Sequence, residues 1–377
     1  MNPILPWLEP WNLPYETRQS KSKALPLKSV CQHPVKQVKQ KSRWNMAQKI
    51  NQCERVGVNP RWPSYKSVCA RVARGPHVED AFYVNAIREY ITREDARPTG
   101  SMMVPNKNNA TDTTPERMVR GRLHRVLATA PDNPQWLQEL AHWMRYYQVG
   151  IWQLFFWAGQ FDVLAKAVGN DRRQQNYSIQ TAANMLAAMA ILGWKEAVIH
   201  QGYLTHAALN RGHQLVIEYE EEHRRAQAFM LRVFADWVGD VSHQWPAYAY
   251  DEPIYEALLA KWRTPSPDDL MPCLLAACDR HTWQTGKESQ KNSYDFNQDW
   301  HLERVPVEIL YILRLRQWEG LANPQQIDHP LMAAPFDQLP PEQPVPELDE
   351  LMQGVLKRAR EDWPQYDEVL SLPALKG

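Results

Sequence analysis

Three side chains with the chemistry of metal ligands lie close together in the chain: Asp236, Asp240 and His243. Their spacing of four and three residues would place them on one face of a continuous helix, where two carboxylates and an imidazole could bind a divalent metal ion. Gly239 and Ser242 fall between them, and glycine is typical of a helix end. The pattern therefore favours a solvated helix end over a metal site.

A second possible ligand set comprises His200, His206 and His213. Histidines that bind one metal ion from a single helix are commonly four residues apart, as in the H-E-x-x-H motif of zinc enzymes. The spacings here are six and seven residues, and that motif is absent. We expect polar or helix-capping histidines rather than metal ligands.

The sequence Cys278-Asp279-Arg280-His281 brings a thiol, a carboxylate and an imidazole together. A nucleophilic cysteine needs a base beside its sulfur and a third group that orients the base. Cys278 and Cys273 belong to the apolar string MPCLLAAC, however, so buried structural thiols are the simpler interpretation. The chain has five cysteines and no C-x-x-C pair, which favours reduced cytosolic thiols over a disulfide framework or a zinc site.

Other signatures of enzyme chemistry are missing from the sequence. It contains no Gly-rich phosphate loop, no G-x-S-x-G motif and no kinase motif set, and only 15 of its 377 residues are glycine. We therefore predict that the protein is not an enzyme and holds no cofactor. A helical active site of unfamiliar type, built around Asp240 or Cys278, is the alternative.

Positive and negative charges balance in the chain, with 43 basic and 43 acidic side chains. A dedicated nucleic-acid-binding protein is usually basic overall, so we expect no nucleic-acid partner. The acidic run Glu220, Glu221 and Glu222 precedes two arginines, which is typical of a solvated helix face with ion pairs four residues apart. Its functional interpretation is a surface that docks a basic partner.

Helices must position all of these groups, because the sequence predicts almost no other regular secondary structure. Apolar residues recur with a helical period, and capping residues and glycines mark the helix ends. The expected helices cover residues 77–95, 134–147, 151–168, 178–192, 194–209, 215–238, 252–262, 267–281, 307–319 and 347–362. Strand signals are scarce. The sequence therefore predicts an all-α fold, either a multi-helix bundle or a short irregular solenoid of antiparallel helical hairpins, with a Pro-rich N-terminal extension.

Composition divides the chain into four parts. Residues 1–97 form a Pro-rich basic arm followed by short helices, and residues 98–113 form a linker loop. Residues 114–330 form the main helical domain, and residues 331–377 form a Pro-rich acidic tail with a terminal helix. Within the main domain, residues 178–192 are apolar on nearly every side, which places them at the centre of the bundle.

The chain shows no targeting or membrane signal. Its first residues are Pro-rich and lack the charged and apolar regions of a signal peptide. The most apolar window, residues 149–169, is interrupted by polar side chains. We expect a cytoplasmic protein without a membrane partner. Its 16 tryptophans and 15 tyrosines suit a large core and an interface alike.

Three segments of the chain resemble the helical immunity proteins of bacterial polymorphic toxin and type VI secretion systems. They are WPAYAYDEPIYEALL (residues 245–259), LLAACDRH (residues 274–281) and VPVEILYILRLRQWEGLANPQQIDHPLM (residues 305–332). The resemblance extends over residues 134–335 and carries over no individual functional residue. It implies a cytoplasmic antitoxin that binds the toxin domain of a cognate secreted effector and occludes its active site.

Tight inhibition of this kind uses aromatic anchors at the centre of an interface and complementary charge at its rim. The candidate anchors are Trp245, Tyr248, Tyr250 and Tyr255, and the candidate acidic groups are Asp251, Glu252, Glu220, Glu221 and Glu222. The aromatic residues surround a connection between two predicted helices. A second hypothesis is a helical scaffold or adaptor of a multi-subunit complex, tethered by its arm and its acidic tail.

Overall fold

The computed structural model describes residues 53–74, 80–92, 133–167, 179–210, 224–243, 245, 247–285, 295–296 and 302–377. Within these residues the chain is all α, as predicted, with α-helices and short 3-10 helices and no strand. No helix in this part of the chain has both the length and the apolar character needed to cross a membrane. Residues Asn45–Gly377 form one compact unit, and every contact described below lies within it. Residues 1–44, the linker at 98–113 and the predicted helix start at 114 lie outside the described residues.

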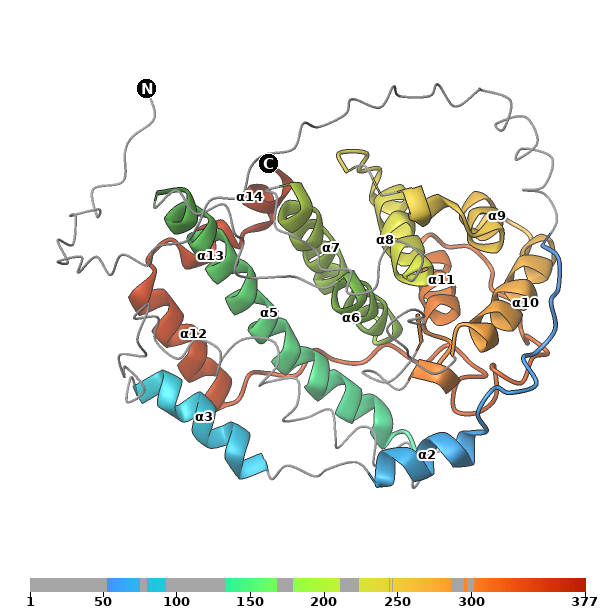
Figure 1. Ribbon diagram of the computed structural model, residues 1–377, viewed down its shortest axis with the longest axis horizontal. Helices are drawn as coiled ribbons and strands as arrows, with labels where there is room; N and C mark the ends of the chain where they lie inside the picture. The colour runs from blue at the N-terminus through green and yellow to red at the C-terminus, as the bar shows by residue number, and fades with distance from the viewer. Residues whose placement is uncertain are drawn as a thin grey trace, which may run out of the picture. The chain divides into compact units, whose positions relative to one another are not determined.

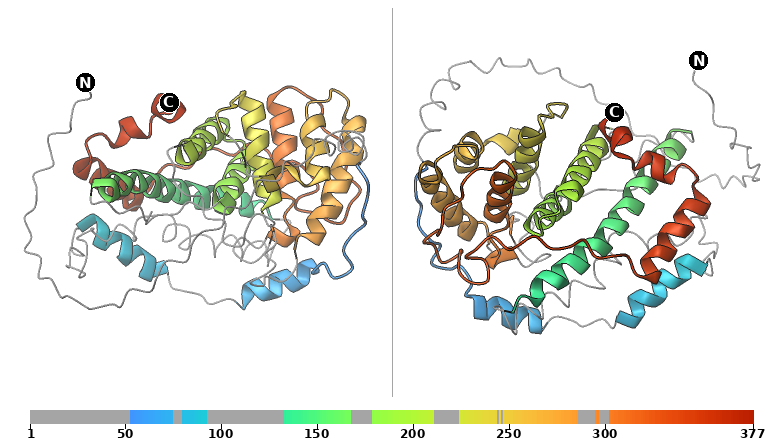
Figure 2. Two further views of the ribbon diagram at one scale, coloured as in Figure 1. Left: turned by 45° about the horizontal axis from the view of Figure 1, so that its top comes forward. Right: turned by 180° about the vertical axis from the view of Figure 1, so that it is seen from behind.

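The centre of the unit is α6 (Ile179–Ile191), which is buried on almost every side, as its apolar sequence predicts. It packs against α5 (Gln135–Ala167), α7 (Lys195–Asn210), α8 (Arg225–Val238) and α11 (Val307–Trp318). α6 therefore lies between α5 and the pair α8 and α11 (Figure 1, Figure 2).

α7 and α8 approach each other closely at Gly202. A side chain at this position would meet the ring of Phe234 in α8, because an added Cβ would lie 2.1 Å from the nearest ring carbon. The glycine thus sets the distance between the two helices. This close approach also brings His206, one turn further along α7, near the end of α8.

α9 (Pro253–Lys261) and α10 (Pro267–Trp283) pack against each other, and α9 also contacts α8. Both helices begin with proline, which is favoured in the first turn because its missing N–H would have no helical partner there. The connection between α8 and α9 includes the 3-10 helix η2 (Ala247–Tyr250). This connection contains most of the residues predicted to bind a partner.

The C-terminal residues pack onto the same unit. α12 (Glu350–Asp362) packs against α3 (Asp80–Thr92) and α5, and α14 (Leu372–Lys376) packs against α7 after the short α13 (Tyr366–Val369). Asp349 caps α12, because its carboxylate accepts a hydrogen bond from the Met352 N–H at 3.0 Å. These C-terminal helices belong to the same compact unit as the helices before residue 330.

A single helix, α5, replaces the two helices predicted for residues 134–147 and 151–168. Gly150 lies inside it, and a glycine costs a helix interior about 0.5–1 kcal/mol relative to alanine. Its neighbours Val149 and Ile151 are fully buried. Tertiary packing of this kind outweighs local propensity, so the helix continues through the glycine.

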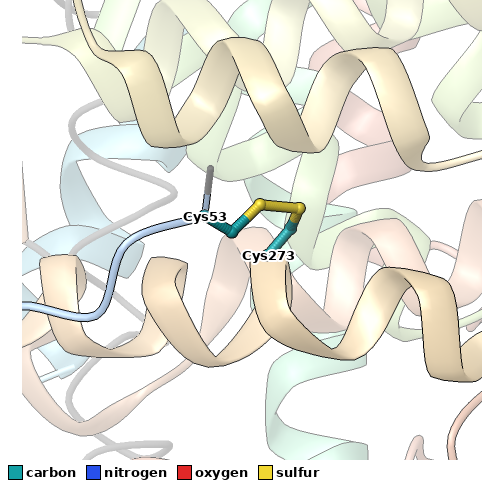
Figure 3. Close-up of a disulfide and its surroundings, with 2 residues drawn as sticks. All are labelled: Cys53 and Cys273. Carbon is teal, nitrogen blue, oxygen red and sulfur yellow. A yellow bond between two sulfur atoms is a disulfide. The ribbon is translucent and has the colours of Figure 1, made fainter. Parts of the chain in front are cut away.

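Cys53 and Cys273 form a disulfide (Figure 3), which corrects the prediction that the cysteines are all reduced. Their Cα atoms are 4.8 Å apart although 220 residues separate them in the chain, so no local pattern indicates the pair. Cys69 and Cys278 form no disulfide, and Cys278 is buried as predicted. Cys31 lies outside the described residues.

Candidate functional site

The α8–α9 connection, residues 239–252, begins with a tight turn at the end of α8. Gly239 has a φ of 71°, a left-handed conformation that glycine adopts without strain and that commonly ends a helix. The Asp240 N–H donates to the Ala235 carbonyl at 2.9 Å, and the Asp240 carboxylate accepts from the Ser242 N–H at 2.8 Å. These bonds fix the turn and leave Val241 92% exposed at its tip.

His206 fixes the same turn from the α7 side. Its Nδ1 lies 2.6 Å from Asp240 Oδ2, while its Nε2 is buried and has no hydrogen-bond partner among the described residues. Burial raises the pKa of Asp240, but the hydrogen bonds from His206 and Ser242 outweigh burial and bring the pKa below its usual value. Asp240 is therefore a carboxylate at neutral pH, and Nδ1 of His206 carries the proton that it accepts.

Aromatic rings surround this pair. The rings of His243 and Trp245 lie 6.3 and 6.0 Å from the ring of His206, and 4.7 Å from each other. Burial and the neighbouring His206 lower the pKa of His243. The side chain of Trp245 is only partly exposed and packs against the core, so it supports the turn more than it offers a free surface.

The second half of the connection presents Tyr250, whose side chain is 45% exposed. The guanidinium carbon of Arg232 in α8 lies 4.1 Å from the centre of its ring, which is within the range of a cation–π interaction. Arg232 is itself held by hydrogen bonds to the Ala249 carbonyl and to both carboxylate oxygens of Glu256. An exposed aromatic ring is thus fixed on a buried arginine.

Asp251 follows Tyr250 and is also fixed. Arg225, the first residue of α8, donates from Nε and Nη2 to the two carboxylate oxygens of Asp251, with the second bond at 3.0 Å. The Asp251 side chain remains 48% exposed. Hydrogen bonding to this carboxylate raises the pKa of Arg225. Tyr250 and Asp251 therefore form an exposed pair, one aromatic and one acidic, whose positions α8 determines.

Two of the predicted partner-binding residues are buried instead. The ring of Tyr255 stacks on Phe229 at 4.7 Å, and its hydroxyl donates to Gln284 at 2.8 Å. Glu252 accepts a hydrogen bond from Arg280 at 2.7 Å. Both side chains pack the interior because they belong to the start of α9, where the chain turns back to the core.

The remaining members of the predicted set are not described at the level of their side chains. Glu220, Glu221 and Glu222 lie outside the described residues, as does the side chain of Tyr248. In the described part of the connection, Gly239, Val241, Ser242, Tyr250 and Asp251 are exposed, and Trp245 is partly exposed.

The structure separates Asp236 from Asp240 and His243. Asp236 accepts a hydrogen bond from Trp262 Nε1 at 2.8 Å and forms an ion pair with Arg263. Asp240 turns the other way, to His206, because the helix ends at Gly239. The sequence pattern missed this His206–Asp240 pair, since only the packing of α7 on α8 brings the two residues together. Among the described residues, no group of three or more histidine, cysteine or acidic side chains could hold a metal ion.

Cys278 and His281 do not form a nucleophile and base. Both ring nitrogens of His281 are engaged, Nδ1 with Glu308 at 2.9 Å and Nε2 with the Leu302 carbonyl at 3.1 Å. Burial raises the pKa of the Cys278 thiol well above its usual value, so the thiolate form is strongly disfavoured. Asp279 points elsewhere, to Arg55 and His329. The prediction of a buried structural thiol at Cys278 is confirmed.

Comparison with known proteins adds no relative. Neither a family model, nor a curated protein, nor a solved structure matches this chain. The functional argument therefore depends on the α8–α9 connection itself.

Proposed function

We propose that this protein binds another protein through the α8–α9 connection, and that the partner is a toxin domain whose active site it occludes. The protein would then act as an immunity protein, as the sequence resemblance implies. The observation that carries the proposal is the exposed pair of Tyr250 and Asp251, which Arg232 and Arg225 hold in place.

Rigid exposed aromatic residues favour protein binding for an energetic reason. Ordering a free side chain at an interface costs about 0.5–1.5 kcal/mol, and a side chain that is already fixed avoids most of this cost. Tyrosine buries a large apolar area and keeps a hydroxyl for hydrogen bonding, which is why it is common among binding hot spots. Tyr250 combines both properties, because its ring is exposed yet lies on Arg232.

The neighbouring groups suit the rim of such an interface. Asp251 offers a carboxylate beside Tyr250, and a toxin that acts on a polyanion has a basic cleft that a carboxylate complements. Val241 offers an apolar side chain on a turn that His206 and Ser242 fix. An aromatic anchor, an acidic group and an apolar tip therefore occur on one connection.

The proposal is tested by co-expression with the C-terminal domain of the protein encoded directly upstream. Growth rescue together with a complex recovered through an affinity tag would support an immunity protein. Rescue without a complex would indicate an antidote that acts enzymatically. A complex without toxicity or rescue would instead indicate a scaffold, and neither binding nor rescue would count against the proposal for this partner.

The same cells can test the site. We expect Tyr250→Ala to lose rescue and to weaken binding, because it removes the exposed ring. Phe82→Ala is the matched control, since Phe82 is 64% exposed but belongs to α3, which packs against α12. If the two substitutions changed rescue and binding equally, the interface would not include Tyr250 of the α8–α9 connection.

A further inference from the structure

The segment of residues 53–62, here called the N-terminal strap, runs along α10 and ends just before α2 (Tyr65–Ala73) (Figure 1). The disulfide from Cys53 to Cys273 attaches one end of the strap to α10 (Figure 3). At the other end, Trp62 Nε1 donates to the Glu303 carbonyl at 2.7 Å, and the guanidinium of Arg304 lies 3.5 Å from the centre of the Trp62 ring.

The carboxylate of Asp279 in α10 is a second attachment point. Arg55 donates to both of its oxygens, with the Nη2–Oδ1 bond at 2.9 Å, and the Gly57 N–H donates to Oδ2 at 3.0 Å. On its inner side, His329 Nε2 donates to Oδ1 at 3.1 Å. The Asp279 side chain is fully buried, so the strap supplies two of the three groups that keep a buried carboxylate hydrogen-bonded.

Further hydrogen bonds continue the attachment along α10. The Asn59 N–H donates to the Thr282 hydroxyl at 2.9 Å, and the Asn59 side chain donates to the Thr282 carbonyl at 3.3 Å. Trp283 Nε1 donates to the Gly57 carbonyl at 2.8 Å. The strap is therefore held on α10 by polar contacts at alternate residues, Arg55, Gly57 and Asn59, besides its disulfide.

We propose that the strap is a redox-sensitive device, in which the Cys53–Cys273 bond forms and breaks reversibly and the bonds to Asp279 set how strongly it forms. Polar contacts that keep the reduced strap on α10 also keep the two thiols together, which raises their effective concentration. Linkage is reciprocal, so the disulfide strengthens the polar contacts by the same factor as those contacts strengthen the disulfide.

The bond opens by thiol–disulfide exchange with a dithiol reductant. Its thiolate attacks Cys53 Sγ, because Cys53 is partly exposed whereas Cys273 is fully buried. Cys273 leaves as a thiolate and takes up a proton. The second thiol of the reductant then attacks the mixed disulfide and releases Cys53 as a thiol, so two electrons and two protons reach the protein while the dithiol becomes a disulfide.

Opening of the strap would change the surface of α10. Val56 and Val58 of the strap are 52% and 37% exposed, and Trp283, which donates to the carbonyl of Gly57 between them, is 40% exposed. These exposed apolar side chains belong to two segments that are held together only while the strap lies on α10. Release of the strap would separate Val56 and Val58 from Trp283 and expose the carboxylate of Asp279 to solvent.

The test is an equilibrium titration in mixtures of reduced and oxidised glutathione, with the linked and free cysteines counted by alkylation and mass spectrometry. We expect Arg55→Gln to lower the equilibrium constant for disulfide formation about tenfold, the effect of losing a partly exposed charge-assisted hydrogen bond pair. Arg61→Gln is the control, because Arg61 belongs to the same strap and its exposed side chain forms no hydrogen bond or ion pair with the described residues. We expect it to leave the constant unchanged.

Equal equilibrium constants for disulfide formation in the two variants would show that the bonds to Asp279 are not coupled to the disulfide. If Cys53 and Cys273 remained unlinked in excess oxidised glutathione, the proposal as a whole would be overturned. Hydrogen exchange of the unsubstituted protein provides a measurement that does not depend on the folding of a variant. We expect faster exchange at Gly57 and Asn59, whose N–H groups bind α10, after addition of dithiothreitol. Unchanged exchange in the reduced protein would also contradict the proposal.

Discussion

Buried arginines bind backbone carbonyls and carboxylates in this protein, and each one joins two elements. Arg314 donates to the carbonyls of Ala190 and Ile191 in the last turn of α6, where the helix runs out of its own N–H donors; the Ala190 carbonyl also accepts from the Gly193 N–H at 2.8 Å. Arg232 joins α8 to the α8–α9 connection and to α9. Arg232 thereby fixes the part of the candidate site that includes Tyr250.

We predict that Arg232→Gln lowers the free energy of unfolding by about 2–3 kcal/mol, because it leaves the partly buried carboxylate of Glu256 without its partner. The control is Arg263→Gln, which breaks an ion pair with both partners about 40% exposed, 41% for Arg263 and 43% for Asp236. We expect the control to cost about 0–1 kcal/mol. Urea denaturation measures both values, and similar losses would contradict the assigned role of Arg232.

Three imidazoles, one buried and two partly buried, make stability depend on pH. Burial lowers the pKa of His200, His243 and His329 because it disfavours the charged ring. The unfolded chain then binds protons more readily than the folded protein. The contribution of these histidines to the free energy of unfolding is therefore fully present above about pH 6.5, the pKa of histidine in the unfolded chain. It decreases as the pH falls below that value.

His200→Gln tests this pH dependence at one residue. His200 Nε2 donates to the Leu370 carbonyl at 2.7 Å, and a glutamine amide can make the same bond without titrating. We expect the loss of unfolding free energy between about pH 7 and pH 5 to be smaller in the variant than in the original protein. Denaturation curves at several pH values would contradict the account if both proteins lost the same amount.

At the scale of elements, the sequence predicts the helices well and their continuity less well. The central helix α6 has the predicted extent because its apolar side chains leave no other arrangement. Local propensity predicts a break at Gly150, but the residues on both sides of this glycine are buried and α5 continues through it. Helix ends are local properties, whereas continuity through a weak position depends on tertiary contacts.

Gly202→Ala tests the packing of α7 on α8. Its new Cβ would overlap the Phe234 ring, and we expect a loss of about 2–3 kcal/mol despite the better helix propensity of alanine. Gly354→Ala in α12 is the matched control, since its Cβ would meet the flexible end of Ile91 at 2.9 Å. We expect that change to be close to neutral. If thermal or urea denaturation ranks the two variants in the opposite order, the described helix approach is wrong.

At the scale of the whole molecule, contacts between distant parts of the chain escape the sequence. The acidic tail predicted for residues 331–377 ends in three helices, α12, α13 and α14, of which α12 packs on α3 and α5 and α14 packs on α7. The disulfide joins positions 220 residues apart. Likewise the candidate site is only partly predictable: Tyr250 and Asp251 stand out as an aromatic and an acid beside a helix cap, but the burial of Tyr255 follows from tertiary packing alone.

We predict that reduction, or the double substitution Cys53→Ser and Cys273→Ser, lowers the free energy of unfolding by roughly 2–5 kcal/mol. The crosslink closes a long loop, so its loss restores conformational entropy to the unfolded chain. Cys69→Ser, which removes a thiol that forms no disulfide, is the control. Urea denaturation with and without a reductant would contradict the prediction if the curves coincided.

The claim that the α8–α9 connection binds a toxin domain is tested most directly by calorimetry. The purified upstream toxin domain is titrated into three proteins: the original chain, Tyr250→Ala and Phe82→Ala. The account predicts tight binding by the original chain and by Phe82→Ala, and binding about 30-fold weaker for Tyr250→Ala, the loss expected for an anchor worth about 2 kcal/mol. Equal affinities for all three proteins would show that the α8–α9 connection is not the interface. Absence of heat with the original chain would contradict a direct complex with this toxin.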